Sequence, residues 1–308
     1  MEKNILIIGG TRFFGKLLVQ RLLNSGHRVT LATRGLAKDT FGDTVQRLQV
    51  DRQNAVAMAE IFSAQDGYDV VYDQMCYTPA DARISIDVFA GKVGRYVMSS
   101  NIETYAGLNY GQLRRPYRET DLKLDLLNID ADERWQNTGF AEQHYGLGKR
   151  LAEACLQRDG RLPVVSIRIP HVLAGPADFT GRLAFYVHLA MQNGILRHSP
   201  DAGRSSFTTA DAITDFMCWA GNETFTGPIN GPSCGELNAP DIFKEVGQVF
   251  EKEVRTQAAG CPGSPSELSP FDYPHPYLMD NARAASLGYA FDVKPDWLNE
   301  LIAQHIAA

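Results

Sequence analysis

The sequence has no paired-cysteine motif and no histidine cluster. Its five cysteines are scattered over 308 residues without a CxxC pair: Cys76, Cys155, Cys218, Cys234 and Cys261. This spacing indicates neither a disulfide framework nor a zinc site, and we expect a reducing, cytoplasmic environment. The seven histidines show no ligand spacing, so we predict no metal site.

Long apolar runs and an excess of positive charge are missing as well. The first apolar run, Ile5–Ile8, ends at a glycine and is too short for a secretory leader or a membrane span. Lys and Arg number 30 against 36 Asp and Glu, which gives a formal net charge of -6 and a pI near 5.7. Because binding a polyanion needs a cationic excess, we expect a soluble protein with a small-molecule substrate rather than nucleic acid as its partner.

Apolar strand-like runs alternate with helical patterns through the first half of the chain. Helical spacing is clearest at Phe14–Leu23 and Ala55–Phe62. Strands are predicted at 4–9, 28–33, 45–50, 69–73, 95–100 and 162–169. Continuous β-rich runs separated by helices are typical of a parallel, doubly wound sheet covered on both faces, the α/β Rossmann class.

The pattern changes after Pro170, where glycine and proline punctuate shorter elements. With 44% hydrophobic residues, the chain is long enough for a core domain and a smaller companion. We predict a dinucleotide-binding Rossmann domain at 1–172, completed by about 206–224. The segments 173–205 and 225–308 would form a smaller α/β lobe that binds the substrate.

A glycine-rich turn follows the first predicted strand and opens the first predicted helix. Glycines in such a turn let the backbone approach a pyrophosphate, and the helix N-terminus offers unpaired N–H groups and a partial positive charge. Arg12 stands where the middle glycine of the usual fingerprint would be. We predict a modified dinucleotide site made by Gly9, Gly10, Thr11, Arg12, Phe13, Phe14 and Gly15.

The second predicted strand ends in "LATRG". An NAD site generally has an acidic residue here for the ribose hydroxyls, whereas arginine suits a 2′-phosphate. In this sequence Thr33 takes the place of the acid, with Arg34 beside it. A guanidinium matches phosphate oxygens well, so Arg12 and Arg34 favour NADP over NAD.

Two further strand ends carry candidate contacts. Asp51 ends the third predicted strand, where its carboxylate would accept from the adenine amino group or cap the following helix. The prediction counts Arg52, Gln74 and Met75 as further cofactor contacts. Cys76 comes next and is a candidate substrate contact, with packing as the alternative.

The stretch "HYGLGKRLAEACL" at 144–156 carries a Tyr and Lys pair. Tyr145 and Lys149 are four residues apart, so on a helix they share one face. Tyrosine titrates at about 10 in water, and a nearby ammonium with an oxidised nicotinamide stabilises its phenolate. We therefore predict that Tyr145 is a general acid/base.

These motifs together resemble the extended short-chain dehydrogenase/reductase family of nucleotide-sugar epimerases and dehydratases. The resemblance covers nearly the whole chain. It is carried by "GGTRFFG", "YVMSSNIETY" at 96–105, "YGLGK", "RIPHVLAGP" at 168–176, "RSSFTTAD" at 204–211 and "DNARAASLGY" at 280–289. "TRG" and "DVVYDQMCY" are most similar to a divergent branch that includes chloroplast stem-loop-binding proteins and bacterial relatives.

The resemblance implies roles for several residues. Tyr145 and Lys149 would be the catalytic pair and would also contact the cofactor, as would Pro170. His171 falls where the family commonly has a substrate-contacting asparagine, and Arg204 where an arginine often binds the diphosphate of the sugar nucleotide. A homodimer paired through the helix of Tyr145 is also implied.

One position departs from the family pattern. The catalytic Ser or Thr usually precedes the tyrosine after the fifth strand by four residues, and here that position is Asn101. Its amide can donate a hydrogen bond to a substrate carbonyl but cannot relay a proton as a hydroxyl does. Ser100 and Thr104 are neighbouring alternatives, and Glu103 would add a carboxylate at the pocket mouth.

The sequence therefore predicts an NAD(P)-dependent oxidoreductase or epimerase that transfers hydride at a carbinol carbon of a polar, nucleotide-sugar-like substrate. Epimerisation, dehydration and simple reduction stay open. The alternative is a non-catalytic nucleotide-binding protein of the same fold with an RNA-binding or redox-sensing role. Asn101 and the basic patch Arg114, Arg115 and Arg118 favour this alternative, and the negative net charge opposes it.

Overall fold

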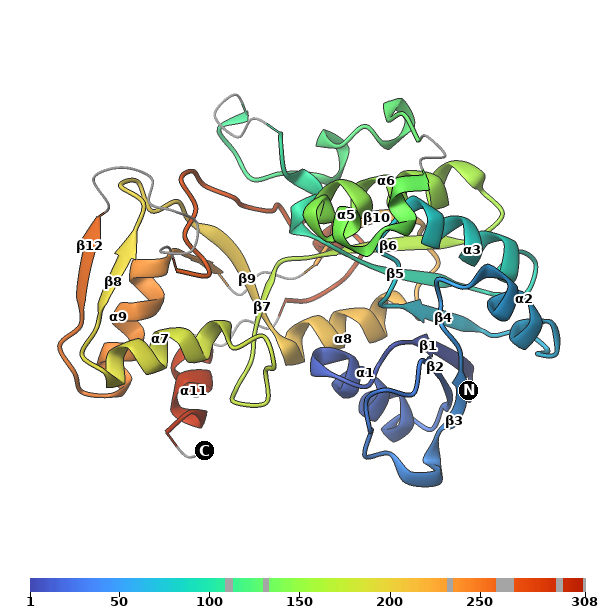
Figure 1. Cartoon of the computed structure of the whole chain (residues 1–308), viewed down its shortest axis with the longest axis horizontal. Coiled ribbons are helices and arrows are strands. Elements are labelled where there is room, and N and C mark those ends of the chain that lie inside the picture. The colour runs from blue at the N-terminus through green and yellow to red at the C-terminus, as the bar shows by residue number, and fades with distance from the viewer. Residues whose placement is uncertain (109–112, 130–132, 232–234, 259–268, 292–295, 307–308) are drawn as a thin grey trace. The chain divides into compact units, whose positions relative to one another are not determined.

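The computed structural model describes residues 1–108, 113–129, 133–231, 235–258, 269–291 and 296–306. The chain divides into two compact units, each described here by itself (Figure 1). Unit 1 comprises Met1–Gly107, Glu119–Ile169 and Ile213–Gly231. Unit 2 comprises Leu108–Arg118, Pro170–Ala212 and Pro232–Ala308.

These boundaries differ in three places from those drawn on the sequence. The first part of unit 1 ends at Ile169 rather than at 172, its returning segment is Ile213–Gly231 rather than 206–224, and Leu108–Arg118 belongs to unit 2. The reason for the last difference is strand-like pairing far along the chain. The Tyr117 backbone N–H donates to the Leu278 carbonyl at 2.7 Å, and Tyr117 forms an isolated bridge with Met279.

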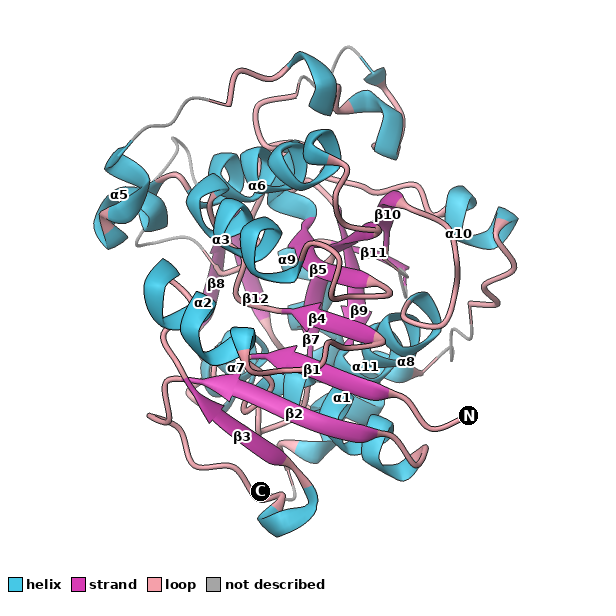
Figure 2. Ribbon diagram, turned by 90° about the vertical axis from the view of Figure 1, so that its right-hand side faces the viewer, coloured by secondary structure: helices cyan, strands magenta, loops and turns pink. Residues whose placement is uncertain are grey.

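Unit 1 contains a seven-stranded sheet in which every paired strand is parallel, in the order β10-β6-β5-β4-β1-β2-β3. Figure 2 shows β3, β2, β1 and β4 side by side. The order reverses between β1 and β4, which is the topological switch point where ligands of such sheets bind. The strands are β1 Asn4–Ile8, β2 Arg28–Thr33, β3 Gln46–Gln49, β4 Val70–Asp73, β5 Tyr96–Asn101, β6 Val164–Ile169 and β10 Gly227–Asn230.

Helices cover both faces of this sheet, as the sequence predicts for a doubly wound fold. Helices α2, α3 and α6 lie on one face, and α1 and α8 on the other (Figure 1). Their bounds are α1 Phe13–Asn24, α2 Ala55–Ser63, α3 Pro79–Phe89, α6 Tyr145–Asp159 and α8 Ala210–Ala220. The short helix α5, Thr138–Gln143, precedes α6, and single 3-10 turns occur at Gly42–Thr44, Ile102–Tyr105, Glu119–Asp121, Leu124–Leu126 and Glu133–Gln136.

The apolar core of unit 1 explains the continuous apolar runs of its central strands. Leu6 and Ile8 face α2, α3 and α6, where they join one cluster with Phe62, Ile86 and Leu156. The alternate residues of β1 are buried as well. A strand that is buried on both faces has no polar alternation to show.

Unit 2 has smaller sheets and its own core. A three-stranded sheet has the order β11-β9-β7, and β8 pairs in parallel with β12. The strands are β7 His171–Leu173, β8 Ile195–His198, β9 Ser205–Thr209, β11 Gly235–Leu237 and β12 Arg255–Ala258. The helices are α7 Arg182–Met191, α9 Ala239–Val249, α10 Ala282–Ser286 and α11 Trp297–Gln304. Aromatic and aliphatic side chains from β9, α7, α9 and α11 form one buried cluster.

The described ranges contain neither a membrane-spanning helix nor a metal-binding cluster. No helix there combines the length and apolar character needed to cross a membrane. The same residues hold no group of three His, Cys, Asp or Glu side chains arranged to bind a metal ion.

Candidate functional site

The predicted glycine turn connects β1 to α1 at the carboxyl edge of the unit 1 sheet. Gly9 and Gly10 have φ angles of 102° and 84°, a region that side chains with a Cβ rarely adopt. A Cβ on Gly10 would lie 2.9 Å from Ile7 Cγ2. On Gly15, in the first turn of α1, a Cβ would overlap the side-chain oxygen of Gln74. The turn therefore needs all three glycines.

Gln74 and Met75, predicted as cofactor contacts, reach this turn from the end of β4. The Gly10 backbone N–H donates to Gln74 Oε1 at 3.1 Å. A Cβ on Gly9 would lie 3.2 Å from Met75 Cγ. The Gln74 Nε2 atom is buried and has no hydrogen-bond partner among the residues that the structure describes, so this donor is available beside the glycine turn.

The two arginines of the NADP argument are at neighbouring strand ends. Arg12 is the N-cap residue of α1, and Arg34 follows β2 directly; both side chains are exposed. Strands β1 and β2 pair with Ile8 opposite Ala32, so both residues follow the carboxyl edge of the sheet. Thr33 stands where an NAD site generally has an acidic residue. Its hydroxyl accepts a hydrogen bond from the Gly35 backbone N–H at 3.2 Å.

Asp51 does not cap α2. The cap is Asn54, whose side chain accepts from the Ala57 backbone N–H at 3.0 Å. The Asp51 carboxylate is exposed and accepts from the Gln53 backbone N–H at 3.0 Å. Of the two roles that the sequence leaves open for Asp51, the adenine contact is therefore the one that stays a prediction.

Arg52, predicted as a cofactor contact, is instead committed to the protein core. Its guanidinium is buried and forms ion pairs with Asp73 and with Asp81, the latter at 3.2 Å. It also donates to the Ser85 hydroxyl at 2.7 Å. A buried guanidinium is stable only with such partners. The three partners are distant from Arg52 in the sequence, so the sequence pattern could not show that they bind it.

The Tyr and Lys pair meets Asn101 at the carboxyl edge of the same sheet. Helix α6 begins at Tyr145, whose side chain is 38% exposed. Asn101 Nδ2 donates to the Tyr145 hydroxyl oxygen at 2.5 Å. Lys149 is buried, and its ammonium donates to the carbonyls of Cys76 at 2.8 Å and Ser99 at 2.7 Å. Burial lowers the pKa of Lys149 to about 8.

Glycines in "YGLGK" bring α6 close to the strand ends. A Cβ on Gly146 would lie 2.5 Å from the Glu103 carbonyl oxygen. A Cβ on Gly148 would lie 2.7 Å from the Tyr77 carbonyl oxygen. Any larger residue at either position would push the first turn of α6, and with it Tyr145, away from the sheet.

Ser100, offered by the sequence as an alternative to Asn101, points to the opposite face of β5. Its hydroxyl donates to Glu153 on α6, which forms a fully buried ion pair with Arg168 at 2.7 Å. Successive side chains of a strand alternate between faces, so Ser100 and Asn101 cannot both face Tyr145. The structure therefore corrects the assignment of Ser100 as a catalytic residue.

Thr104, Glu103 and Cys76 were also predicted to contact the substrate. The Thr104 hydroxyl donates to the Asn101 carbonyl at 2.9 Å. Glu103 is half-buried in the 3-10 turn after β5. The Cys76 side chain lies in the apolar core cluster, and burial raises the pKa of its thiol well above the usual value. Cys76 is thus a packing residue whose backbone, not its thiol, serves the site.

Ser99 was missed by the sequence reasoning, although strand alternation places it on the same face of β5 as Asn101. It lies one residue beyond Met98, which pairs with Asp73 of β4, so it is level with Gln74. Three side-chain atoms at this edge are buried and have no hydrogen-bond partner within the described part of the chain: Gln74 Nε2, Ser99 Oγ and Asn101 Oδ1. Unpaired buried polar atoms are rare in proteins, and three together indicate a ligand site.

The remaining predicted contacts belong to unit 2. His171 is buried against three aromatic rings, and its Nε2 lies 2.8 Å from the Tyr273 hydroxyl. Burial, with the Arg182 charge, lowers the pKa of His171 to about 3, so its ring stays neutral. Arg204 pairs with Asp241 at 2.9 Å, and Pro170 follows β6 directly. The roles of His171 and Arg204 in substrate binding and of Pro170 in cofactor binding stay predictions.

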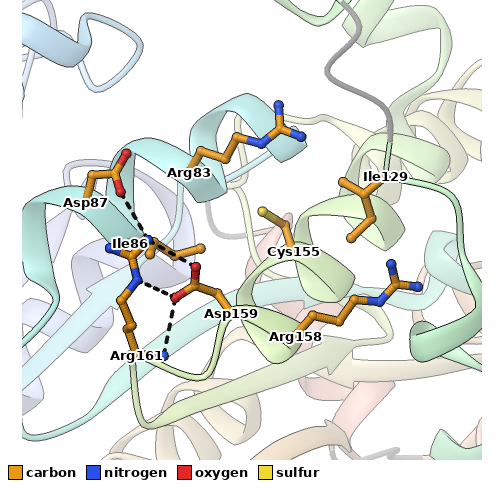
Figure 3. Close-up of a pocket in the computed structure, with 8 residues that line it drawn as sticks. All are labelled: Arg83, Ile86, Asp87, Ile129, Cys155, Arg158, Asp159 and Arg161. Atoms are coloured by element: carbon orange, nitrogen blue, oxygen red, sulfur yellow. Dashed lines mark hydrogen bonds and ion pairs between the residues drawn. The ribbon is translucent and has the colours of Figure 1, made fainter.

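A separate cavity of about 470 Å³ lies in unit 1 beside α3 and the C-terminal half of α6 (Figure 3). At one end of it, Arg161 forms ion pairs with Asp159 and Asp87, at 2.7 Å and 3.2 Å. It is lined by Arg83, Ile86, Asp87, Ile129, Cys155, Arg158, Asp159 and Arg161. None of the predicted catalytic or cofactor residues lines this cavity.

Comparisons with known proteins match this geometry. Residues 5–85 match the model of the NAD dependent epimerase/dehydratase family. Solved structures similar over nearly the whole chain include UDP-glucose 4-epimerase from Thermus thermophilus in complex with NAD. That likeness has a TM-score of 0.70 at 16% identity and covers 99% of each chain. The chain has the fold of the extended short-chain dehydrogenases/reductases.

Other solved structures and one curated protein agree. The dTDP-glucose 4,6-dehydratase from Bacillus anthracis, in complex with NAD, gives a TM-score of 0.71 at 12% identity, over 98% of this chain and 96% of that one. The UDP-N-acetylglucosamine 4-epimerase from Bacillus cereus gives a TM-score of 0.70 at 16% identity, over 98% of this chain and 95% of that one. The chloroplast stem-loop binding protein of 41 kDa b from Arabidopsis thaliana is 42% identical over 85 residues. This match spans 23% of the chain and 22% of that relative.

These findings confirm the fold class and the resemblance predicted from the sequence. In the extended short-chain dehydrogenase/reductase fold, the crevice beside the reversal of strand order lies between β1 and β4. The glycine turn and Gln74 are at that point, and the Asn101–Tyr145 contact is one strand further along.

Proposed function

We propose that the protein is an NAD(P)-dependent enzyme that transfers hydride at a carbinol carbon of a polar, nucleotide-sugar-like substrate. The observation that carries this proposal is the 2.5 Å contact from Asn101 Nδ2 to the Tyr145 hydroxyl oxygen, with Lys149 four residues further along α6. Epimerisation, dehydration and reduction all begin or end with this transfer. The geometry favours none of the three.

The residues at the carboxyl edge fit a dinucleotide. The N-terminus of α1 and the glycine turn suit the pyrophosphate. The unpartnered Gln74 Nε2, Ser99 Oγ and Asn101 Oδ1 supply donors and an acceptor further along the edge. Arg12 and Arg34 are exposed and suit a 2′-phosphate, which supports NADP, although two of the solved structures named above contain NAD.

The chemistry assigned to this chain's residues is proton transfer. The bound nicotinamide supplies the hydride acceptor and donor. Tyr145 exchanges the proton of the substrate oxygen as general base and acid. Lys149 and Asn101 both favour the phenolate, the first by its charge and the second by its N–H. Asn101 has no hydroxyl to relay the proton, so Tyr145 exchanges it directly with substrate or solvent.

The test uses nucleotide sugars with the purified protein. UDP-glucose, UDP-N-acetylglucosamine and dTDP-glucose are incubated with NAD or NADP, and products are followed by proton NMR. We expect conversion of at least one substrate, and we expect Tyr145→Phe to reduce it about 100-fold or more while cofactor affinity stays within twofold. Unchanged turnover in Tyr145→Phe would remove Tyr145 from the mechanism.

A second candidate function is RNA binding. The curated relative is named for stem-loop binding, and Arg114, Arg115 and Arg118 form a basic cluster. Arg118 pairs with Asp280 at 3.0 Å, which offsets its charge, and Arg115 uses one of its N–H donors on the Pro116 carbonyl at 2.9 Å. Retention of RNA at low salt that is lost on changing Arg114 and Arg115 to Glu would support this function. No retention at low salt would end it.

We also propose a homodimer that pairs through α6, as the family resemblance implies. Light scattering during gel filtration measures the mass directly. A mass near 34.1 kDa would contradict this proposal.

A further inference from the structure

Lys149 carries a buried positive charge that forms no ion pair with a carboxylate of the described residues. Its ammonium has three hydrogens, and two of them go to the carbonyls of Cys76 and Ser99. The carboxylates of Asp73 and Asp81 raise its pKa from a distance, but both form ion pairs with Arg52, whose own charge opposes them. The Cys76 thiol stays protonated because burial raises its pKa. A buried charge needs further stabilisation.

The ring of Tyr77 provides it. Lys149 Nζ lies 4.2 Å from the centre of this ring, well within the range at which a cation is attracted to an aromatic face. The Tyr77 ring also contacts the ring of Tyr145, with their centres 5.9 Å apart. One aromatic side chain thus touches both members of the predicted catalytic pair.

The backbone on both sides fixes this ring in place. The Tyr77 N–H donates to the Asp81 carboxylate at 2.9 Å, next to the capping box that Thr78 and Asp81 form at the start of α3. The Tyr77 carbonyl lies against Gly148, where a Cβ would come within 2.7 Å. The backbone of Tyr77 is therefore held between the first turns of α3 and α6, which limits the positions that its ring can take.

We propose that Tyr77 is a positioning residue, whose aromatic face keeps the Lys149 ammonium charged and in place beside Tyr145. The catalytic consequence of this role rests on the proposed function. The electrostatic contact between the Tyr77 ring and Lys149 does not depend on it. Because burial already lowers the pKa of Lys149 to about 8, a further fall would leave much of this lysine neutral near pH 7. A neutral Lys149 stabilises the Tyr145 phenolate less, so turnover would need a higher pH.

The test compares Tyr77→Phe with Tyr77→Leu. Phe keeps the aromatic face and loses only the hydroxyl, which lies 3.5 Å from the Met75 sulfur; Leu keeps an apolar side chain without a π face. The Lys149 titration is followed by NMR in lysine-labelled protein, and Lys149→Arg assigns its signal. We expect the midpoint to stay within about 0.3 pH unit in Tyr77→Phe and to fall by about one unit in Tyr77→Leu.

A graded series guards against failure of Tyr77→Leu to fold. Phenylalanine analogues with one, two or three ring fluorines at position 77 keep the shape and weaken the negative face of the ring stepwise. The Lys149 midpoint should then fall with each fluorine. An unchanged midpoint across the series would overturn the proposal, because a ring that only fills space would give that result.

Turnover separates this proposal from the proposed function. The pH of half-maximal turnover should rise in Tyr77→Leu and stay unchanged in Tyr77→Phe. If the Lys149 midpoint follows the series and no nucleotide sugar is converted by the unaltered protein, the contact stands and the proposed function fails. If turnover exists and its pH profile is the same in all variants, Tyr77 has no positioning role.

Discussion

The side-chain oxygen of Gln74 occupies the space that a side chain at Gly15 would need. The same oxygen accepts the Gly10 N–H at 3.1 Å, so one carboxamide holds the glycine turn closed from the neighbouring strand. The third glycine of this fingerprint thus serves to admit Gln74 as well as to allow close packing of α1.

Gly15→Ala is the first test of that relationship. The new methyl group would overlap Gln74 and lie 3.1 Å from Gly10 Cα, and we expect a loss of about 1–3 kcal/mol in the free energy of unfolding. The double change Gly15→Ala with Gln74→Ala should recover most of it. Urea denaturation measures both. Gly139→Ala in α5 is the control, because its Cβ would meet only an ordinary contact at 3.4 Å; equal losses at the two glycines would contradict the argument.

Asn101→Asp tests the donor to Tyr145. The change keeps the shape of the side chain but replaces the N–H donor with a negative charge beside the hydroxyl oxygen. The phenolate is then disfavoured, and we expect the pH of half-maximal turnover to rise by about one unit. Asn24→Asp, at the exposed end of α1, should leave the profile unchanged. A gain in turnover on Asn101→Ser would instead mark Asn101 as a degenerate catalytic position.

Arg34→Ala tests the preference for NADP. Loss of a guanidinium that binds the 2′-phosphate should weaken NADPH binding about tenfold, since charge-assisted hydrogen bonds are worth roughly 1.5–3 kcal/mol, and should leave NADH binding unchanged. Cofactor fluorescence measures both affinities. Arg28→Ala, at the other end of β2, is the matched control. If the unaltered protein binds NADH as tightly as NADPH, the argument from Arg12 and Arg34 is wrong.

Asp73→Asn tests the buried network that holds Arg52. Burial raises the pKa of Asp73, but Arg52 and hydrogen bonds from Tyr96 and the Met75 backbone N–H outweigh it and hold the pKa below the usual value. A lowered pKa stabilises the fold above the pKa of the unfolded state, about 3.9, and this contribution is lost as the pH falls through the folded value. We expect Asp73→Asn to cost about 3 kcal/mol at pH 7.

The cost of Asp73→Asn should shrink as the pH falls below about 4, because the unfolded chain of the unaltered protein then takes up a proton that its folded state, with the lowered pKa, does not yet bind. Urea denaturation at pH 7 and at pH 3 gives the two values. Asp51→Asn is the exposed control and should stay within about 0.5 kcal/mol. A cost that does not change with pH would show that the Asp73 charge contributes nothing.

The six strands expected from apolar runs are all present in the sheet, and their ends agree within two residues. The run at 28–33, for example, is β2 Arg28–Thr33, and 162–169 is β6 Val164–Ile169. β10 Gly227–Asn230 was not expected, because four residues containing a glycine and a proline carry no apolar run. Such a strand forms only because β6 offers it a partner.

The site divides in the same way. Local pattern was enough to locate the glycine turn and the Tyr145 and Lys149 pair, because each depends on spacing within one turn or helix. The family resemblance was needed to single out Asn101. Ser100 and Arg52 were assigned wrongly, since their partners, Glu153 and Asp73, are distant in the sequence. Tyr77 and Ser99 carry no motif, and only packing reveals them.

The amino-acid order by itself determined the doubly wound sheet and the residue types at its carboxyl edge, because burial on two faces and the backbone needs of glycine act over a few neighbouring residues. The tertiary structure alone decided which polar groups form hydrogen bonds or ion pairs with one another and which remain available to a ligand. Arg52 and Ser100 are bound within the core, whereas Gln74 Nε2, Ser99 Oγ and Asn101 Oδ1 have no partner. Hydrogen bonding depends on distance in space, and the chain brings these residues together only on folding.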